Sequence, residues 1–266
     1  MTSPSTTPAL AVRLDGVGRT FGDRVVLRDV DLEIAEGEIL AIIGASGSGK
    51  STLLRQVAGL DIPDTGTVTI DGTPLPGIDQ RSAVAFQEPR LLPWRSVSRN
   101  VEVGLPRATP RSAGRARVEQ LLALVQLSDA ASLRPRQISG GMAQRASLAR
   151  ALARGPGVLV LDEPFGALDA LTRLTMQDLL LDIHAAEPTT ILLVTHDVDE
   201  ALYLADRVVL LGVEPGYAPH SGAVVRSVIT VPGARPRDRG SASLAHLRAE
   251  LLDGLGVSTH HPAHTF

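Results

Sequence analysis

The feature that most constrains this chain is a glycine- and serine-rich segment between an apolar stretch and a helical pattern. Ile39–Ile43 is continuously apolar, which is typical of a strand buried on both faces, and residues 50–60 show helical periodicity. The sequence from Gly44 onward, Gly44-Ala45-Ser46-Gly47-Ser48-Gly49-Lys50-Ser51, fits the phosphate-loop pattern in full. Glycines let successive backbone N–H groups turn toward one anion, and the helix start adds its positive end. Strand, loop and helix together predict a site for a nucleoside triphosphate.

Two side chains at the end of this loop have chemistry suited to a triphosphate. The Lys50 ammonium can reach the β- and γ-phosphates, and the Ser51 hydroxyl can hold Mg²⁺. Thr52 follows them in the first turn of the helix and joins the predicted nucleotide-binding set. The alternative is a chance match in a Gly/Ser-rich turn, which the flanking strand and helix make rare. The segment therefore predicts that the chain binds ATP or GTP.

Composition narrows the kinds of protein that could carry this loop. Of 266 residues, 44% are hydrophobic and 21% are charged, which fits one large folded domain, alone or with an inserted one. The net charge of −3 indicates no overall basic field, so we expect no nucleic-acid partner, and the lack of cysteine excludes disulfides. No stretch approaches the roughly 20 apolar residues that cross a bilayer. We also expect no secretory signal, so the chain would serve a membrane only through a partner.

The order of predicted elements divides the chain into a front β region, a core and an insertion. Short alternating strands are predicted in the front region at 11–14, 25–34 and 68–71, with turns at Gly16, Gly22 and Asp71-Gly72. Prolines punctuate helical patterns without strands from about 90 to 154, which indicates an inserted helical subdomain. The core resumes with strands at 158–161, 190–195 and 207–211 and helices at 170–186 and 198–205. This alternation predicts an α/β fold with a mostly parallel sheet covered by helices on both faces.

The two ends of the chain are expected to lie outside the nucleotide-binding domain. Residues 1–9 are rich in Ser, Thr and Pro and are expected to be flexible, and the domain itself is expected to span 10–231. Residues 232–266 form a predicted tail with one modest helix around 243–254. His260, His261 and His264 in this tail could suggest a metal site, but no carboxylate pattern accompanies them, and we favour a tail without a metal.

Acidic and polar residues follow the predicted core strands. Asp162 and Glu163 come directly after the apolar strand at 158–161, and the carboxyl end of such a strand lies beside the phosphate loop in a doubly wound sheet. Asp162 would hold the Mg²⁺ ion, and Glu163 would polarise the attacking water. His196 ends another apolar strand and could contact the γ-phosphate or that water. Paired acids alone more often form a solvated turn, and a lone histidine is more often a packed residue, so these predictions depend on the phosphate loop.

A second anion-binding helix start is predicted at Ser139-Gly140-Gly141-Met142. Ser139 is a good N-cap residue, and the two glycines permit the close approach of a backbone. Because this stretch lies in the inserted helical region, one nucleotide cannot easily be wrapped by both helix starts of one chain. The economical interpretation is a homodimer in which the Ser139 segment of each chain closes the ATP site of the other. A capped helix without a ligand is the alternative when the stretch is considered alone.

Taken in order, these motifs resemble the nucleotide-binding subunit of ATP-binding-cassette (ABC) transporters over nearly the whole chain. The segment 44–51 resembles the Walker A loop, 158–163 resembles Walker B with its catalytic Glu163, and 139–142 resembles the family signature. Gln87, after Val84-Ala85-Phe86, matches the Q-loop, and His196 matches the switch histidine. Gly166-Ala167-Leu168-Asp169 matches the D-loop, which implies that Asp169 contributes to the nucleotide site.

The resemblance has consequences for fold, metal and partners. It implies a P-loop NTPase with an antiparallel β subdomain at the front and an inserted helical subdomain. It also implies that Ser51, Gln87 and Asp162 hold Mg²⁺, with Glu163, His196 and Gln87 as the catalytic set and with ATP as the nucleotide. The expected partners are a second copy of the chain, the transmembrane permease subunits and, indirectly, a solute-binding protein. The expected location is the cytoplasmic side of the cell inner or plasma membrane, as a peripheral protein.

Two positions depart from the commonest family pattern. The signature usually reads Ser-Gly-Gly-Gln, whereas Met142 stands in the fourth position here. The serine and glycines that would meet phosphate remain. The aromatic residue that stacks on adenine is usually Tyr, and Phe21 is the candidate in this chain, with a small core aromatic as the alternative.

Three further segments resemble one group of importers, those for nitrate, taurine and alkanesulfonates. Residues 86–94, Phe-Gln-Glu-Pro-Arg-Leu-Leu-Pro-Trp, carry the general likeness, and 166–179 and 231–237 look most like the subunits for aliphatic sulfonates. These residues would not touch the solute, so nitrate, taurine or another organic anion stays open. A soluble ABC ATPase, an unrelated phosphate-loop kinase or GTPase, and half of an exporter are the remaining alternatives.

Overall fold

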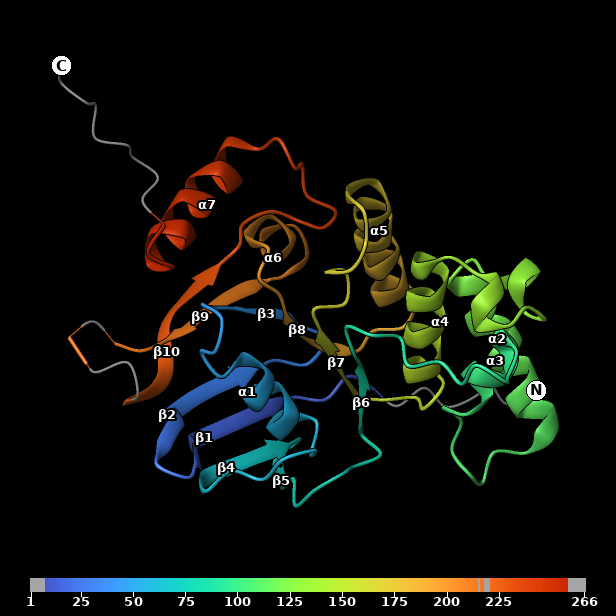
Figure 1. The fold of residues 1–266 in the computed structure, drawn as a ribbon, viewed down its shortest axis with the longest axis horizontal. Coiled ribbons are helices and arrows are strands. Elements are labelled where there is room, and N and C mark those ends of the chain that lie inside the picture. Colours follow the sequence, from blue (N-terminus) through green and yellow to red (C-terminus); the bar gives the residue numbers. More distant parts are fainter. Residues whose placement is uncertain (1–7, 215, 218–220, 258–266) are drawn as a thin grey trace.

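The computed structural model describes residues 8–214, 216–217 and 221–257, and the strands of this part form one sheet with helices on both sides (Figure 1). The order of the strands across the sheet is β5-β4-β1-β2-β10-β9-β3-β8-β7-β6. The strands are β1 (Val12–Phe21), β2 (Arg24–Ile34), β3 (Ile39–Ile43), β4 (Thr65–Ile70), β5 (Thr73–Pro74), β6 (Ser82–Ala85), β7 (Val158–Asp162), β8 (Thr190–Val194), β9 (Arg207–Gly212) and β10 (Ser221–Thr230). The helices are α1 (Lys50–Val57), α2 (Val97–Glu102), α3 (Arg111–Leu124), α4 (Gly140–Leu152), α5 (Ala170–Ala186), α6 (Val198–Leu204) and α7 (Ala242–Gly254).

The centre of the sheet is parallel and buried on both faces. β3 lies between β8 and β9, and β7 lies between β8 and β6, with all four pairings parallel. Alternate residues of a strand point to opposite faces. Leu40 and Ile42 pack in the hydrophobic cluster that contains Leu53 of α1, whereas Ala41 and Ile43 pack in the cluster beneath α4, α5 and α6. Two covered faces explain why the strand before the phosphate loop is an unbroken apolar run.

The front of the chain forms the predicted antiparallel region. β1 pairs with β2 and with β4, and the predicted turns at Gly22 and at Asp71-Gly72 are confirmed. The predicted turn at Gly16 is wrong, because β1 continues through this residue. Gly16 has a φ of 57° and lies where the pairing register shifts between Leu14 and Val17, so it forms a bulge within the strand.

Three strands, β5, β6 and β10, fall outside the predicted elements, and β10 joins the two halves of the sheet. β10 pairs in parallel with β2 and antiparallel with β9, so it connects the front region to the parallel core. β6 is four residues long and extends the far edge beside β7. Neither segment shows a clean alternation of apolar and polar residues, because β10 bends through an irregular register and β6 is too short.

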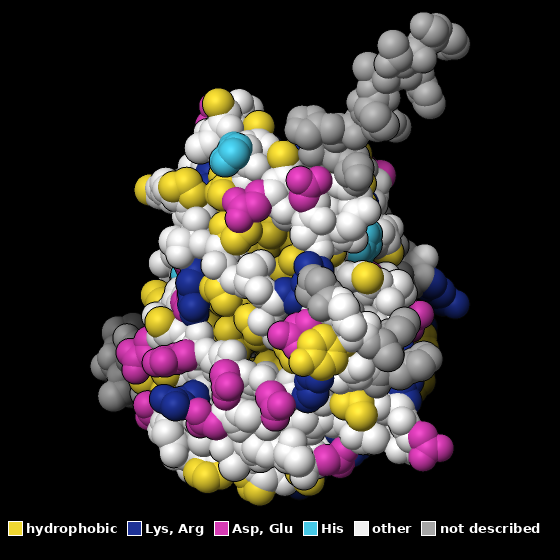
Figure 2. Space-filling model, turned by 90° about the vertical axis from the view of Figure 1, so that its left-hand side faces the viewer, with side chains coloured by type: hydrophobic (Ala, Val, Ile, Leu, Met, Phe, Trp, Pro, Cys, Tyr) yellow, Lys and Arg dark blue, Asp and Glu magenta, His cyan; other side chains and the backbone are white. Residues whose placement is uncertain are grey.

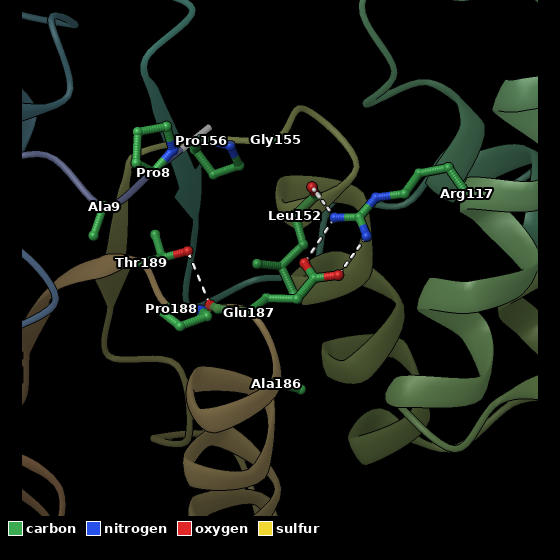
Figure 3. A pocket seen from close by; sticks show the side chains of 10 residues that line it. All are labelled: Pro8, Ala9, Arg117, Leu152, Gly155, Pro156, Ala186, Glu187, Pro188 and Thr189. Carbon is green, nitrogen blue, oxygen red and sulfur yellow. Dashed lines mark hydrogen bonds and ion pairs between the residues drawn. The ribbon is translucent and has the colours of Figure 1, made fainter. Parts of the chain in front are cut away.

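The helices α2, α3 and α4 form a lobe to one side of the sheet (Figure 1), as predicted for the insertion. A cavity of about 270 Å³ lies where this lobe meets the loop before β8 (Figure 3). Arg117 of α3 reaches across it and forms a two-pronged ion pair with Glu187, with Nη2 donating to Oε2 at 2.7 Å. Both side chains are only 8% exposed. The lobe is thus tied to the core by a buried pair of charges.

Replacing Arg117 with Met should lower the free energy of unfolding by about 3–5 kcal/mol, because Glu187 would be left buried without its counter-charge. Urea unfolding followed by circular dichroism measures this loss. Arg115→Met, on the exposed side of the same helix, is the matched control and should change stability by less than about 0.5 kcal/mol. Equal small losses in both variants would contradict the assigned importance of the pair.

The segment after Val231 returns to the core. α7 packs beside α6, and its Leu244 and Leu251 are buried in the large hydrophobic cluster. Arg237, also buried, donates to the carbonyl oxygens of Leu202 and Tyr203 at the end of α6. His260, His261 and His264 lie outside the described residues. The domain boundaries at 10 and 231 stay predictions, and within the described residues the chain is packed from Leu10, whose N–H donates to the Gly157 carbonyl, to α7.

The surface mixes charges of both signs. Figure 2 shows acidic and basic side chains interspersed on the face turned toward the viewer. Exposed ion pairs such as Arg13–Asp15 and Arg28–Glu214 contribute at most about 1 kcal/mol each, so the two hydrophobic clusters carry the stability. Within the described residues, the helices are all too short or too polar to cross a bilayer.

Candidate nucleotide-binding site

The predicted phosphate loop opens onto a cavity of about 550 Å³ beside the carboxyl end of β3. The residues that line it are Phe21, Arg24, Val26, Gly44, Ser46, Gly47, Gly49, Lys50, Ser51, Thr52, Glu163 and His196. The cavity therefore brings most of the predicted loop together with the candidate adenine contact and two of the predicted catalytic residues. Ala45, Ser48, Gln87, Asp162, Asp169 and the Ser139 segment do not line it.

The loop leaves its backbone amides free at the start of α1. Gly47 and Gly49 have φ angles of 77° and 87°, a left-handed conformation that glycine adopts without strain. Gly49 is the N-cap residue of α1 and has no side chain to bond the first N–H groups, whereas Ser139 and Asp169 cap α4 and α5 with their side chains. The first amides of α1 and the positive end of its dipole therefore remain available to an anion.

Lys50 is buried in the loop without an acidic partner in bonding contact. Its Nζ donates to the carbonyl oxygens of Gly44 (2.8 Å) and Ala45 (2.9 Å). Burial lowers the pKa of Lys50, while the nearby charges of Glu163 and Asp162 act to raise it. The hydroxyl oxygen of Ser48 is also buried and has no hydrogen-bond partner. A phosphate group in the loop would give the ammonium a counter-charge, so the donor set fits the expected ligand.

The strand register brings the acidic and polar strand ends to the same edge of the sheet as the loop. Val194 of β8 lies opposite both Ile42 of β3 and Asp162 of β7. Glu163, one residue after Asp162, and His196, two residues after Val194, consequently leave the sheet side by side, with 3.3 Å between Glu163 Oε2 and His196 Nδ1. This is the arrangement that the sequence predicts for a doubly wound sheet.

Glu163 has an unusual backbone. Its φ of 44° is left-handed, which a residue with a side chain adopts at a cost of about 1–3 kcal/mol. Its N–H donates to the Val194 carbonyl at 2.8 Å, and its own carbonyl accepts from the N–H of Gly166 at 3.1 Å. These bonds hold the strained turn, which directs the Glu163 carboxylate into the cavity.

Asp162 is a candidate metal ligand one residue before Glu163. Burial and the neighbouring charge of Glu163 raise the pKa of Asp162, and Arg55 and Lys50 oppose the rise. A bound cation would relieve this crowding of negative charge, so the acid pair fits an ion such as Mg²⁺. Ser51 lines the same cavity and can offer its hydroxyl.

Gln87 lies near Glu163, whereas Asp169 is the cap residue of α5. A Cβ atom built on Gly166 would lie 3.3 Å from Gln87 Nε2 and 3.6 Å from Glu163 Oε2, so Gln87 and Glu163 approach the same glycine. Asp169 caps α5 by accepting from the Thr172 N–H (3.0 Å) and hydroxyl (2.7 Å), and these bonds lower its pKa. Asp169 does not line the phosphate-loop cavity, so its predicted contact with nucleotide stays a prediction.

The Ser139 segment lies in the other lobe. Ser139 caps α4 by accepting from the Met142 N–H at 3.2 Å, and Ser139 and Gly140 are exposed. A Cβ atom on Gly141 would lie 2.8 Å from the Thr172 methyl group, so the glycine allows α4 to begin against α5. Figure 1 shows α1 and α4 in separate parts of the molecule, and none of 139–141 lines the cavity around Lys50.

Two lining residues were not among the predicted ones. Arg24 and Val26 reach the cavity because the hairpin between β1 and β2 folds over the loop, and Arg24 Nη2 donates to the Gly47 carbonyl at 3.4 Å. The predicted turn at Gly22 was the signal that could have found Arg24, because this turn pairs Arg24 with Phe21. Phe21 itself is 50% exposed, and the Arg19 guanidinium covers one face of its ring at 4.5 Å.

A parallel strand, a glycine-rich loop with a buried lysine and acids at the adjacent strand end define a P-loop nucleotide-binding protein. Residues 27–166 match the family described as ABC transporter. The chain belongs to this family, and the predicted fold class is confirmed.

Proteins with curated names match almost the whole chain. It is 48% identical to an aliphatic sulfonates import ATP-binding protein SsuB 1 of Xanthomonas axonopodis pv. citri, over 96% of this chain and 98% of that protein. It is 50% identical to an aliphatic sulfonates import ATP-binding protein SsuB of Mycobacterium avium, over 93% of both. Among solved structures, the dimeric post-hydrolysis state of the ATP-binding cassette MJ0796 bound to ADP and Pi is similar, with a TM-score of 0.70 and 31% identity over 84% of this chain and 100% of that one.

Proposed function

We propose that this chain binds and hydrolyses ATP as the motor subunit of an ABC importer for aliphatic sulfonates. The observation that carries the proposal is the cavity in which Lys50, Glu163 and His196 meet beside an open helix start. The names of the relatives support the importer and its solute. The same motor would suit a nitrate or taurine importer, because the solute would not enter this chain.

The residues around the cavity have separate roles in the proposed reaction. Lys50 exchanges its bonds to the Gly44 and Ala45 carbonyls for the β- and γ-phosphates, and the loop amides hold the same groups. Glu163 orients and polarises the attacking water, and His196 contacts the γ-phosphate or that water. Hydrolysis of this kind depends mainly on positioning and charge stabilisation.

The proposed metal site uses residues from the first turn of α1, the end of β7 and the loop after β6. Ser51, Asp162 and Gln87 would hold Mg²⁺, which neutralises phosphate charge when it is bound. The raised pKa of Asp162 and the position of Gln87 next to Glu163 across Gly166 support this set.

The second half of the site comes from another copy of the chain. Ser139 and Gly140 are exposed at the start of α4, and neither they nor Gly141 and Asp169 line the cavity of their own chain. In the proposed homodimer each Ser139 segment meets the ATP held by the partner, with Phe21 against the adenine ring. The dimeric state of similar cassettes supports this arrangement.

The proposed working place is the cytoplasmic face of the membrane, where permease subunits would receive the motion and a solute-binding protein would act through them. Deletion of the gene followed by growth with an alkanesulfonate as the only sulfur source tests the solute. Lost growth that the intact gene restores supports the sulfonate assignment. Normal growth, with lost uptake of nitrate or taurine instead, would overturn that assignment alone.

Nucleotide binding at the loop can be tested directly, because Lys50 is the only lysine in the sequence. An amine-acylating reagent therefore has one side-chain target, and we expect ATP with Mg²⁺ to protect it. Peptide mass spectrometry measures the modified fraction of Lys50, and labelling of the terminal amine serves as the internal control. Equal labelling of Lys50 with and without saturating ATP would exclude the proposed contact.

A further inference from the structure

A chain of polar contacts runs from the C-terminal segment to the turn that carries His196. Arg239, between β10 and α7, donates from Nη1 to Oε1 of Gln177 on α5 at 2.5 Å. Gln177 donates from Nε2 to Oε2 of Glu200 on α6 at 3.3 Å. The Glu200 N–H in turn donates to Oδ1 of Asp197 at 3.1 Å. A residue outside the nucleotide cavity is thus connected, contact by contact, to the residue just after His196.

The residues in the middle of this series of contacts are buried. Gln177, Glu200 and Thr195 are each between 2% and 3% exposed. In such an interior, water cannot replace a lost partner, and neighbouring hydrogen bonds strengthen one another. A change at one end of the chain is therefore transmitted to the next group and is not absorbed by solvent.

Glu200 is the point at which the turn is held. Thr195 Oγ1 accepts from the Asp197 N–H at 3.0 Å, and Asp197 Oδ1 accepts from the Glu200 N–H at 3.1 Å. His196 lies between Thr195 and Asp197, so the turn is fixed on both sides of it. The His196 side chain, which is 60% exposed, meets the acidic Glu163 at 3.3 Å.

Arg239, at the outer end of this series of contacts, is held by several groups at once. Besides Gln177, the Arg239 guanidinium pairs with Asp178 at 2.9 Å and lies 3.4 Å from the centre of the Tyr203 ring. The Tyr203 hydroxyl donates to the same Asp178 carboxylate at 2.5 Å. A planar guanidinium held in this way presents its donor to Gln177 in one direction, which a lysine could not reproduce.

We propose that Arg239, Gln177 and Glu200 are positioning residues for His196, so that the C-terminal segment sets the rate of ATP hydrolysis without touching the nucleotide. The inference rests on the proposed role of His196. All three residues lie beyond the part of the chain that matches the ABC transporter family, which ends at residue 166.

This series of polar contacts also makes the position of His196 depend on pH. Burial raises the pKa of Glu200 to about 7, and the Gln177 amide and the nearby Thr195 hydroxyl oppose the rise. The charged groups that face it are Asp197, which adds to the rise, and Arg173 of α5, which opposes it. The Gln177 amide donates to the ionised carboxylate at 3.3 Å, and protonation removes the charge that strengthens this bond. The hold on the first turn of α6 is therefore strongest above about pH 7 and weakens as the pH falls through that value.

The test measures kcat and KM for ATP with the full chain between about pH 6 and about pH 8.5. Glu200→Gln should lower kcat about tenfold at the alkaline end, since one charged hydrogen-bond acceptor is lost, with KM changed less than about twofold. The decline of kcat in the wild type as the pH falls through about 7 should be reduced in this variant. Glu200→Gln removes a buried charge at constant shape, so it should fold.

Further variants test whether these residues act on His196 through one connected series of contacts or lower kcat independently of one another. Gln177→Met breaks the chain while Arg239 keeps Asp178 and Tyr203, and it should lower kcat as Glu200→Gln does. Arg239→Ala should also lower kcat, and Arg239→Lys should restore only part of the loss. The double variant Arg239→Ala/Glu200→Gln should match Glu200→Gln alone, because both act through one path.

The matched control is Arg248→Ala. Arg248 lies in the same C-terminal segment and pairs with Asp199 at 3.1 Å, outside the chain of contacts, so kcat should not change. Additive losses in the double variant, or unchanged kcat and pH profile in Gln177→Met and Glu200→Gln, would overturn the inference. His196→Ala, run in parallel, distinguishes the two levels. If it leaves hydrolysis intact, the proposed role of His196 fails, whereas its loss of activity beside normal Gln177→Met and Glu200→Gln variants defeats only the positioning chain.

Discussion

Glu163→Gln is expected to lower the steady-state rate of ATP hydrolysis by roughly 10²–10³ while ATP binding stays intact. The amide has the shape of the carboxylate, so the strained turn at a φ of 44° and its bond to the Val194 carbonyl can remain. It lacks the negative charge that polarises water, and it cannot attract His196 in the same way. Because bound ATP would then persist, the variant should accumulate as a closed dimer with ATP, which size-exclusion chromatography measures.

Glu102→Gln is a suitable control for this experiment. Glu102 is an exposed acid at the end of α2 that pairs with Arg99 at 2.6 Å, and its loss should leave the rate within about twofold. Hydrolysis by Glu163→Gln at the wild-type rate would show that another group prepares the water. The role assigned to Glu163 would then be wrong, although the phosphate loop could still bind ATP.

Ser139→Arg is expected to abolish measurable hydrolysis without abolishing ATP binding. Ser139 is exposed and caps α4 through one bond to the Met142 N–H, so its replacement should cost the helix about 1 kcal/mol and leave the fold intact. The long side chain would occupy the space that the partner's phosphates need. Binding of a fluorescent ATP analogue and release of phosphate measure the two properties separately.

Ser112→Arg gives the corresponding control, since Ser112 is exposed in the first turn of α3 in the same lobe. It should hydrolyse ATP normally. If Ser139→Arg retains the wild-type rate, the Ser139 segment does not meet nucleotide. A variant that loses both binding and secondary structure would instead mean that Ser139 is needed for folding, which contradicts the small cost expected of a single cap.

The elements that could be predicted from sequence are those whose own residues specify them. β3 is apolar throughout, and β7 and β8 are apolar apart from the terminal Asp162 and Thr190, because both of their faces are covered. α5 spans Ala170–Ala186, as predicted. The meeting of Lys50 with Glu163 also followed, because parallel strands end at one edge of the sheet. The Gly16 turn failed because a glycine with positive φ serves a bulge as well as a turn.

The features that could not be predicted depend on contacts between distant segments. β10 is specified by the edges of β2 and β9 on either side of it and not by its own pattern. Arg24 enters the cavity only through the hairpin, and Arg239 meets Gln177 across 62 positions of the sequence. The proposed contact of the Ser139 segment with ATP is a different case, because it would form between two copies of the chain and not within one.

The composite site can be tested most directly by mixing two inactive variants. Lys50→Ala has a defective loop and an intact Ser139 segment, and Ser139→Arg has the reverse. In a mixed dimer one site pairs the intact loop of one chain with the intact Ser139 segment of the other, while each homodimer has a defect in both sites. We predict that equimolar mixing restores hydrolysis well above the sum of the two separate rates. A mixture that forms dimers but hydrolyses ATP no faster than that sum would contradict a site shared between two chains.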